Sequence, residues 1–257
     1  MTDRTTLLTA ISAFLLAVLC IHPHTRGIFP LWVIAAGGHI ADTLFHEMGH
    51  TIFNWLFGQP AIPMIFTLFG ADQAGGMSMT FGRSWFIQIA VLAGLGYSCW
   101  QAKKSASALF IPALIFTGFI ILVILLGYQQ LIVLYMGHGG SILMGGYFLF
   151  RAWIYLDARN AYERWLNAFF GFFLILSNFG FAYGLAFDPY ANSDYSDHVA
   201  FGVSHNDFMA MSLIVHSWSV KGIAIFTMGL CVASIIGSAI CAVFLRDAFY
   251  TETPDVF

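Results

Sequence analysis

Charged residues are scarce in this chain of 257 residues, since Asp, Glu, Lys and Arg together make up only 9% of it. A soluble globular domain usually carries about 25% charged residues. Because 59% of the residues are hydrophobic, the chain lacks the polar side chains needed to cover a water-facing globule. The composition therefore predicts an integral membrane protein that lies in a lipid bilayer.

Three further features are missing, and each argues against one class of protein. The sequence has no long basic run, so nucleic acid is not an expected partner. Its four cysteines lie in apolar stretches without C-x-x-C spacing and predict small buried side chains. No two histidines are adjacent, whereas a membrane di-iron hydroxylase or desaturase needs a larger histidine cluster that includes such pairs.

Long apolar runs are what the chain does contain, and strict two-residue alternation is absent, which favours helices over a closed barrel. We expect an all-α polytopic bundle of about seven transmembrane helices, in a single domain that covers residues 1–257. The expected helices cover residues 5–21, 28–57, 84–102, 107–127, 131–151, 164–187 and 220–245. Between Gln59 and Gly82, glycines and prolines alternate with apolar residues, which predicts a re-entrant or hairpin loop after the second helix.

Lysine and arginine set the expected orientation. With the N-terminus outside and seven crossings, seven of the ten basic residues face the cytoplasm, and Arg4, Arg83 and Lys221 face out. This arrangement predicts a multi-pass protein, with the bacterial inner (plasma) membrane as its expected location. It also puts the end of the second helix near the outer face.

The sequence His46-Glu47-Met48-Gly49-His50 lies in the second expected helix. Residues four apart share one face of a helix, so His46 and His50 can bind one tetrahedral Zn²⁺. Glu47 lies beside the metal and can take a proton from a zinc-activated water. Since an ionisable residue in a membrane helix costs roughly 2.5–3.5 kcal/mol, three within five positions indicate a function.

A zinc site of this kind needs a third protein ligand, and three candidates stay open. Asp207 is the first choice, because the expected topology brings it to the membrane face where the second helix ends; it could instead cap a helix. His138, in a Met-Gly-His-Gly-Gly sequence, is the second choice and Asp157 the third. Asp42 is on the same helical stripe as His46 and could orient it, or could line a water-filled cleft.

The remaining histidines are weaker candidates. His205 and His216 are expected at helix ends or in a cleft, and His39 on the polar stripe of the second helix. His22, His24 and His198 are expected in loops.

These residues resemble the site-2 protease family of intramembrane zinc metalloproteases, in its small bacterial branch without a PDZ domain. The resemblance rests on the His46–His50 motif, the glycine-rich 70–76 loop, the small-residue stretch 93–97 and the segment that Asp207 opens. It spans about residues 28–245. In the family the usual aspartate stands in Leu-Asp-Gly, whereas here Asp157 is followed by Ala158. The family also places its site toward the cytoplasm, which the charge count opposes.

The resemblance implies a zinc metalloendopeptidase that cleaves a membrane protein or transmembrane peptide with zinc-activated water. Glu47 would then be catalytic, and His46, His50 and Asp207 would hold Zn²⁺. The alternative is a catalytically inactive relative that serves as a subunit or scaffold of a larger membrane complex. A transporter is disfavoured, because no paired broken helices or inverted halves are evident.

Overall fold

The computed structural model describes residues 4–25, 28–65, 75–105, 109–154, 161–197 and 206–250. Within these ranges the chain is all-α apart from one short pair of strands, which agrees with the predicted fold class. The elements in chain order are α1 (Arg4–Ile21), a 3-10 turn η1 (Pro23–Thr25), α2 (Leu31–Leu56), β1 (Ala61–Ile65), β2 (Gly76–Thr80), α3 (Trp85–Lys104), α4 (Phe110–Leu126), α5 (Gln129–Ile154), α6 (Ala161–Phe187), α7 (Pro189–Asp197), α8 (Asp207–Ile214) and α9 (Val220–Tyr250).

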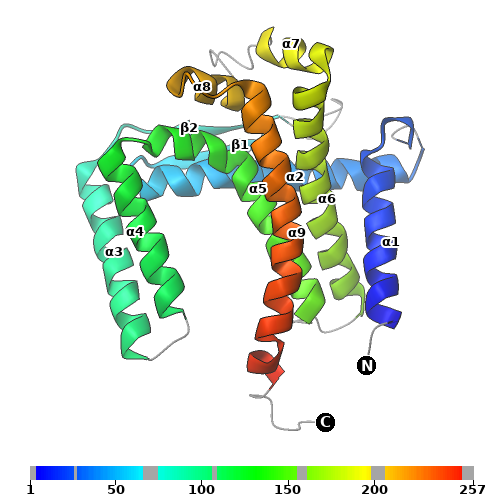
Figure 1. Ribbon diagram of the computed structural model, residues 1–257, viewed down its shortest axis with the longest axis horizontal. Helices are drawn as coiled ribbons and strands as arrows, with labels where there is room; N and C mark the ends of the chain where they lie inside the picture. The colour runs from blue at the N-terminus through cyan, green and yellow to red at the C-terminus, as the bar shows by residue number, and fades with distance from the viewer. Residues whose placement is uncertain are drawn as a thin grey trace.

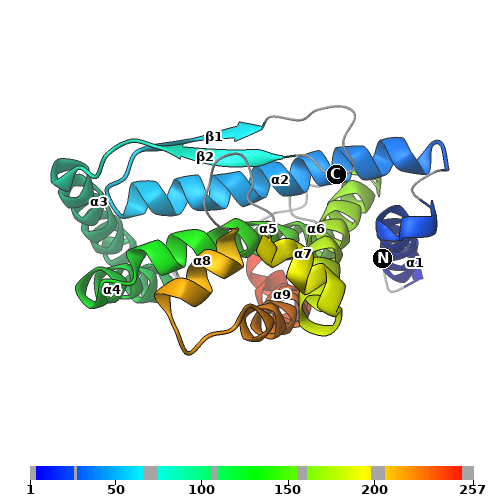
Figure 2. The same ribbon diagram turned by 90° about the horizontal axis from the view of Figure 1, so that it is seen from above.

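Most of the long helices run along one common direction. Figure 1 shows α1, α3, α4, α5, α6 and α9 extending in this direction, with both chain termini at one end of the bundle. The short helices α7 and α8 lie at the opposite end. Helix α2 runs across the others near that same end, which Figure 2 shows from above.

Three helices in the described part of the chain are long and apolar enough to cross a membrane, at Gln129–Ile154, Ala161–Phe187 and Val220–Leu245. Shorter apolar helices occur at Leu7–Ile21 and Phe110–Leu126. Large hydrophobic side chains are exposed along α4 and α9, including Ile115, Leu125, Val243 and Phe244. A continuous exposed apolar surface needs an apolar surrounding, so these findings indicate a membrane protein.

The direction of α2 differs from the expected membrane crossing by residues 28–57. At 26 residues α2 is about 39 Å long, which is more than a bilayer core requires. Its buried positions include the polar residues Glu47, His50 and Asn54, which point into the protein. Hydropathy reports length and apolar content but not direction, so the sequence could not distinguish a crosswise helix from a spanning one.

Helices α2 and α5 cross at very short range through two glycines. A Cβ atom added to Gly49 would collide with the backbone carbonyl oxygen of Met136, and one added to Gly140 would lie 2.8 Å from the Cα of Gly49. No side chain fits between the two backbones at this point. The crossing therefore brings the face of α2 that carries His46 and His50 directly against α5.

The strands β1 and β2 form an antiparallel pair in the region where a re-entrant or hairpin loop was expected. Ala61 pairs with Thr80 at one end of the register and Ile65 with Gly76 at the other. Residues 66–74 between the strands lie outside the described residues. The pair lies along α2 (Figure 2). A hydrogen bond of 3.0 Å joins the Ser78 hydroxyl of β2 to the Thr51 hydroxyl of α2.

Candidate metal centre

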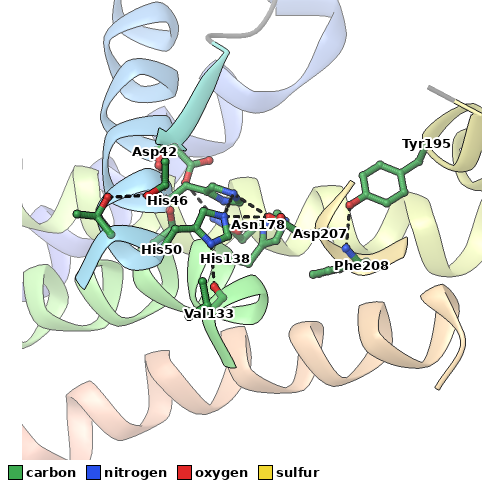
Figure 3. Close-up of polar contacts among 12 residues, drawn as sticks. Asp42, His46, His50, Val133, His138, Asn178, Tyr195, Asp207 and Phe208 are labelled. Carbon is green, nitrogen blue, oxygen red and sulfur yellow. Dashed lines mark hydrogen bonds and ion pairs between the residues drawn. The ribbon is translucent and has the colours of Figure 1, made fainter. Parts of the chain in front are cut away.

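His46 and His50 are close together on the face of α2 that meets α5 (Figure 3), and Glu47 is buried next to His46 on the same helix. The Nε2 atoms of the two imidazoles are 3.1 Å apart. Only 5% of Glu47 and 8% of His50 is exposed. Helical spacing alone explains why these three side chains meet, because four residues make about one turn.

Asp207, the first residue of α8, completes a triangle with the two histidines. Its Oδ2 atom is 3.1 Å from Nε2 of His46 and 3.2 Å from Nε2 of His50. Metal–ligand bonds of 2.0–2.1 Å in a tetrahedron place the ligand atoms about 3.3 Å apart. The three atoms therefore have a spacing that a three-ligand zinc site would need, and Asp207, the first choice from the sequence, is the residue placed beside both histidines.

The hydrogen bond of the second nitrogen in His50 supports a role as a metal ligand. Nδ1 of His50 donates to the carbonyl oxygen of Val133, 2.7 Å away. Nδ1 therefore carries a hydrogen, and Nε2, which faces His46 and Asp207, is the nitrogen that a neutral His50 ring would offer to a metal ion. Metal-binding histidines are usually oriented by such a bond from the other ring nitrogen.

Gly137 of α5 provides the space that a cation at this site would need. A Cβ atom added there would lie 2.5 Å from Nε2 of His46 and closer still to Nε2 of His50. These contacts approach the length of a metal–nitrogen bond, so a side chain at position 137 would occupy space beside both ligand atoms. The glycine in the Met-Gly-His-Gly-Gly sequence leaves that space open.

Glu47 lies beside the triangle without being part of it. Its Oε2 atom is buried and has no hydrogen-bond partner among the described residues. The start of β2 covers the other side of the carboxyl group, since a Cβ atom on Gly76 would come within 2.7 Å of Glu47 Cγ. A buried carboxyl oxygen without a partner is unfavourable, and this one is free to receive a proton.

Asp207 is held in place by residues of α7. Asn206 donates from its side-chain amide to the carbonyl oxygen of Tyr195 at 2.7 Å, and the Tyr195 hydroxyl accepts from the backbone N–H of Phe208 at 3.2 Å. The Asn206 side chain therefore does not cap α8, and the Asp207 carboxyl is directed at the histidines.

The surroundings also keep the Asp207 carboxyl ionised. Burial raises the pKa of this carboxyl, but the neighbouring charge of His50 and the hydrogen bonds from both imidazoles outweigh burial and lower it. The resulting pKa is well below the usual range of an aspartate. Asp207 is therefore an anion at neutral pH, the form in which a carboxylate binds a metal ion.

His138, the second candidate for the third ligand, also lies at this centre. A ring nitrogen of His138, a ring nitrogen of His46 and a carboxylate oxygen of Asp207 all lie within 4.8 Å of one another. Nδ1 of His138 is 2.8 Å from Oδ1 of Asn178 on α6. The structure thus brings His138 to the site from a third helix.

Asp42 was expected either to orient His46 or to line a water-filled cleft. It is among the residues that line a cavity along α2, and its carboxylate accepts hydrogen bonds from the Ser177 hydroxyl and the Asn178 amide, each at 3.0 Å. A separation of one turn on α2 puts Asp42 near His46 in sequence, while the packing of α6 supplies closer donors. Asp42 therefore contacts His138 through Asn178 rather than His46 directly.

A cavity of about 1140 Å³ runs along α2 past these residues. Its lining includes His39 toward one end and Asn54 toward the other, with the triangle and Glu47 between them. The cavity is wide enough to hold a segment of polypeptide against the site.

Other candidates lie elsewhere. His22, His24 and His216 are exposed and are not among the residues lining this cavity. Asp157, His198 and His205 lie outside the described residues.

Sequence reasoning missed Ser177, Asn178, Tyr195 and the role of Gly137. Ser177 and Asn178 had a usable signal, because polar residues in the middle of an apolar helix are expensive and often functional. The sequence carries no comparable signal for the roles of Tyr195 and Gly137, because these roles depend on how the helices pack.

We compared the chain with protein-family models, curated proteins and solved structures. None of them matches. The case for any function therefore comes from the residues and geometry described above.

We expect Gly137→Ala to abolish metal binding. The added methyl group would crowd Nε2 of both His46 and His50, while alanine favours the helix itself by roughly 1 kcal/mol over glycine. Elemental analysis of the purified protein should show zinc lost from a protein that is still folded. The matched control is Gly229→Ala in α9, where an added Cβ meets nothing within 4 Å. Retention of full zinc by Gly137→Ala would contradict the placement of the cation.

We expect Asp207→Ala to lower the zinc content of the purified protein by at least about tenfold, because it removes one corner of the ligand triangle. Asp157→Ala tests the remaining candidate and should keep the wild-type zinc content. His46→Ala gives the reference zinc content of a protein that has lost one histidine of the motif. The reverse pattern, with zinc lost in Asp157→Ala and kept in Asp207→Ala, would exclude Asp207 from the site.

Proposed function

We propose that the chain is a membrane-embedded zinc peptidase that hydrolyses a peptide bond in a membrane protein or transmembrane peptide. The observation that carries this proposal is the triangle of His46, His50 and Asp207 with the unpartnered carboxyl oxygen of Glu47 beside it. Three ligands leave a tetrahedral zinc ion with one open position, which is the arrangement of catalytic rather than structural zinc sites. In these features the chain resembles the site-2 proteases.

The donor set and the space at Gly137 fit Zn²⁺. Zinc bound by two imidazoles and a carboxylate lowers the pKa of water to about 7 and polarises a carbonyl group. Glu47 accepts the proton of the attacking water on its free oxygen and delivers it to the leaving amine. Burial of Glu47 beneath Gly76 keeps bulk water away from this proton transfer.

The strand pair offers a way to position the substrate. A transmembrane helix must unwind before a peptidase can attack its backbone, and an extended segment can add to the edge of a sheet. β2 begins against Glu47, so a peptide aligned with the strand pair would pass the carboxyl group. The cavity along α2 gives such a segment room.

A role as an inactive subunit of a larger complex is the alternative. Such a role requires neither three ligand atoms at metal spacing nor a buried base without a partner, and the described residues offer both. We therefore favour the enzyme over the scaffold.

The charge distribution along the bundle supports a definite membrane orientation. We propose that α1, α3, α4, α5, α6 and α9 cross the bilayer and that α2 lies across them near one membrane face. Among the described residues, the basic ones at the end with the chain termini are Arg4, Lys103, Lys104, Arg151, Arg164 and Arg246, and those near the opposite end are Arg83 and Lys221. Arg26 and Arg159 lie outside the described residues. Because cytoplasmic ends are enriched in Lys and Arg, we place both termini in the cytoplasm, whereas the charge count on the sequence put the N-terminus and Arg4 outside.

In this orientation the metal centre lies toward the extracytoplasmic face, the end at which α7 and α8 are found. The charge count put the centre on the same side, and the resemblance implies the cytoplasmic side instead. The peptidase would act on bonds near the outer surface of a plasma membrane such as the bacterial inner membrane.

Reporter fusions test the orientation without any need for a substrate. A fluorescent protein fused to either terminus of the full chain should fluoresce, and alkaline phosphatase fused at the same positions should be inactive, because both termini are cytoplasmic. Phosphatase inserted after His216, between α8 and α9, should be active. Active phosphatase at the C-terminus would reverse the assignment.

Glu47→Gln tests the enzymatic proposal. The amide keeps the size of the side chain but cannot accept the proton, so we expect hydrolysis to fall by roughly 10²–10⁴-fold with the zinc content unchanged. The assay presents single-span membrane proteins in the same bilayer and detects cleaved products by mass spectrometry. Glu163→Gln on α6 is the matched control and should cleave at the wild-type rate. Equal cleavage by Glu47→Gln would rule out its role as the base.

A further inference from the structure

A chain of hydrogen bonds connects Asp42 on α2, Asn178 on α6 and His138 on α5 (Figure 3). Three helices far apart in sequence each contribute one residue to it. The chain ends in an imidazole that lies at the metal centre. Such a chain can fix both the orientation of the ring and the position of its proton.

The side-chain amide of Asn178 can be oriented in only one way. Its Nδ2 group lies 3.0 Å from Oδ1 of Asp42 and 2.9 Å from the carbonyl oxygen of Leu174. Both partners only accept hydrogen bonds, so both amide hydrogens are used. The Oδ1 atom is therefore the group that faces His138, and it can only accept.

This orientation determines the tautomer of His138. Nδ1 of His138 is 2.8 Å from the Asn178 oxygen, so Nδ1 must carry the hydrogen. In the neutral ring the other nitrogen, Nε2, then has a free lone pair. The Ser177 hydroxyl donates to the second oxygen of Asp42 at 3.0 Å, a bond that takes no part in orienting the Asn178 amide.

Aromatic rings hold the imidazole of His138 in place. Phe181 stacks on it with centroids 4.8 Å apart and planes 14° apart, and Phe208 lies 4.7 Å away on α8. The ring of His46 meets it at right angles, with centroids 4.7 Å apart. Because Phe208 follows Asp207 directly, the same helix that supplies the carboxylate also packs against His138.

We place His138 beside the cation rather than on it. The His46, His50 and Asp207 atoms are 3.1–3.2 Å apart, close to the spacing of direct ligands. The ligand atom of His138 lies within 4.8 Å of those of His46 and Asp207, a range that admits an oxygen atom between them, and Nδ1 is already bonded to Asn178. An open fourth position also agrees with the proposed hydrolysis, on which this inference rests.

We propose that His138 is a catalytic residue of the centre, held by Asn178 and Asp42 with Nδ1 protonated, and that its Nε2 lone pair accepts a hydrogen bond from the reacting water. Asn178 and Asp42 are positioning residues that act through it. Glu47 and His138 then contact the water from two sides, one as the proton acceptor and the other as a fixed point of orientation. Orienting the reactants in this way contributes directly to rate.

Nuclear magnetic resonance of the ring nitrogens tests this proposal without an assay of activity. The full chain is prepared with isotope-labelled histidine and loaded with an NMR-active cadmium isotope in place of zinc. His138→Asn identifies the His138 signals by their loss. We expect cadmium coupling to Nε2 of His46 and His50, and for His138 a protonated Nδ1 with an Nε2 that bears neither hydrogen nor cadmium.

Two variants test the positioning residues. Asn178→Leu removes the acceptor, and we expect His138 to become a mixture of tautomers while the cadmium couplings of His46 and His50 persist. Ser177→Ala is the matched neighbour and should leave the His138 tautomer unchanged, because both donor bonds of Asn178 remain. A fixed Nδ1–H tautomer in Asn178→Leu would remove Asn178 from its role. If that variant does not fold, the wild-type spectrum alone still tests the tautomer and the ligation.

A small zinc-binding inhibitor tests the contact made by Nε2. Acetohydroxamate carries hydrogen-bond donors next to its metal-binding oxygens, so its Kd should rise roughly tenfold in zinc-loaded His138→Asn and stay the same in Ser177→Ala. An unchanged Kd in His138→Asn would overturn the contact.

The spectra separate failure of this inference from failure of the proposed function. Cadmium coupling to His138 would make it a ligand, and a proton on Nε2 would remove the lone pair; either result overturns the inference and leaves the metal centre in place. Cadmium coupling to none of the three histidines would overturn the metal centre itself.

Discussion

The crossing of α2 over α5 determines the position of everything else at the centre. Gly49 and Gly140 allow the two backbones to touch, and no larger residue could stand at either position without moving a helix. The contact places His46 and His50 against Gly137, the point on α5 where no side chain intervenes. A wider crossing would move His46 and His50 away from Gly137 and His138 of α5.

Polar side chains in an apolar bundle are costly unless they are hydrogen bonded, and in this protein nearly all of those near the centre are. Asp42 is paired with Ser177 and Asn178, and His50 with Val133. Glu47 is an exception, because its buried Oε2 atom has no hydrogen-bond partner among the described residues. A bundle selected only for stability gains nothing from such an atom, whereas the hydrolysis that we propose would use it to accept a proton.

Features with a short sequence separation could be predicted, and features that depend on packing could not. His46, Glu47 and His50 are one helical turn apart, so local geometry predicts their meeting. Asp207 followed from a topological argument that brought two helix ends to one membrane face. His138 was recognised only as a candidate, because its contact with Asn178 depends on the packing of α5 against α6, which hydrophobic periodicity does not encode.

The direction of α2 is a second feature that could not be predicted from the sequence. A long apolar helix satisfies the hydropathy criteria for crossing a membrane whether it stands upright or lies flat, and residues 28–57 were expected to cross. The hydrolysis that we propose requires water, which the centre of a bilayer does not supply. With α2 lying across the bundle near the end where α7 and α8 are found, the proposed orientation brings His46 and Glu47 close to a membrane face, and the start of β2 covers Glu47 on one side. A crosswise helix is therefore compatible both with a buried base and with a water molecule that reaches it from the aqueous side.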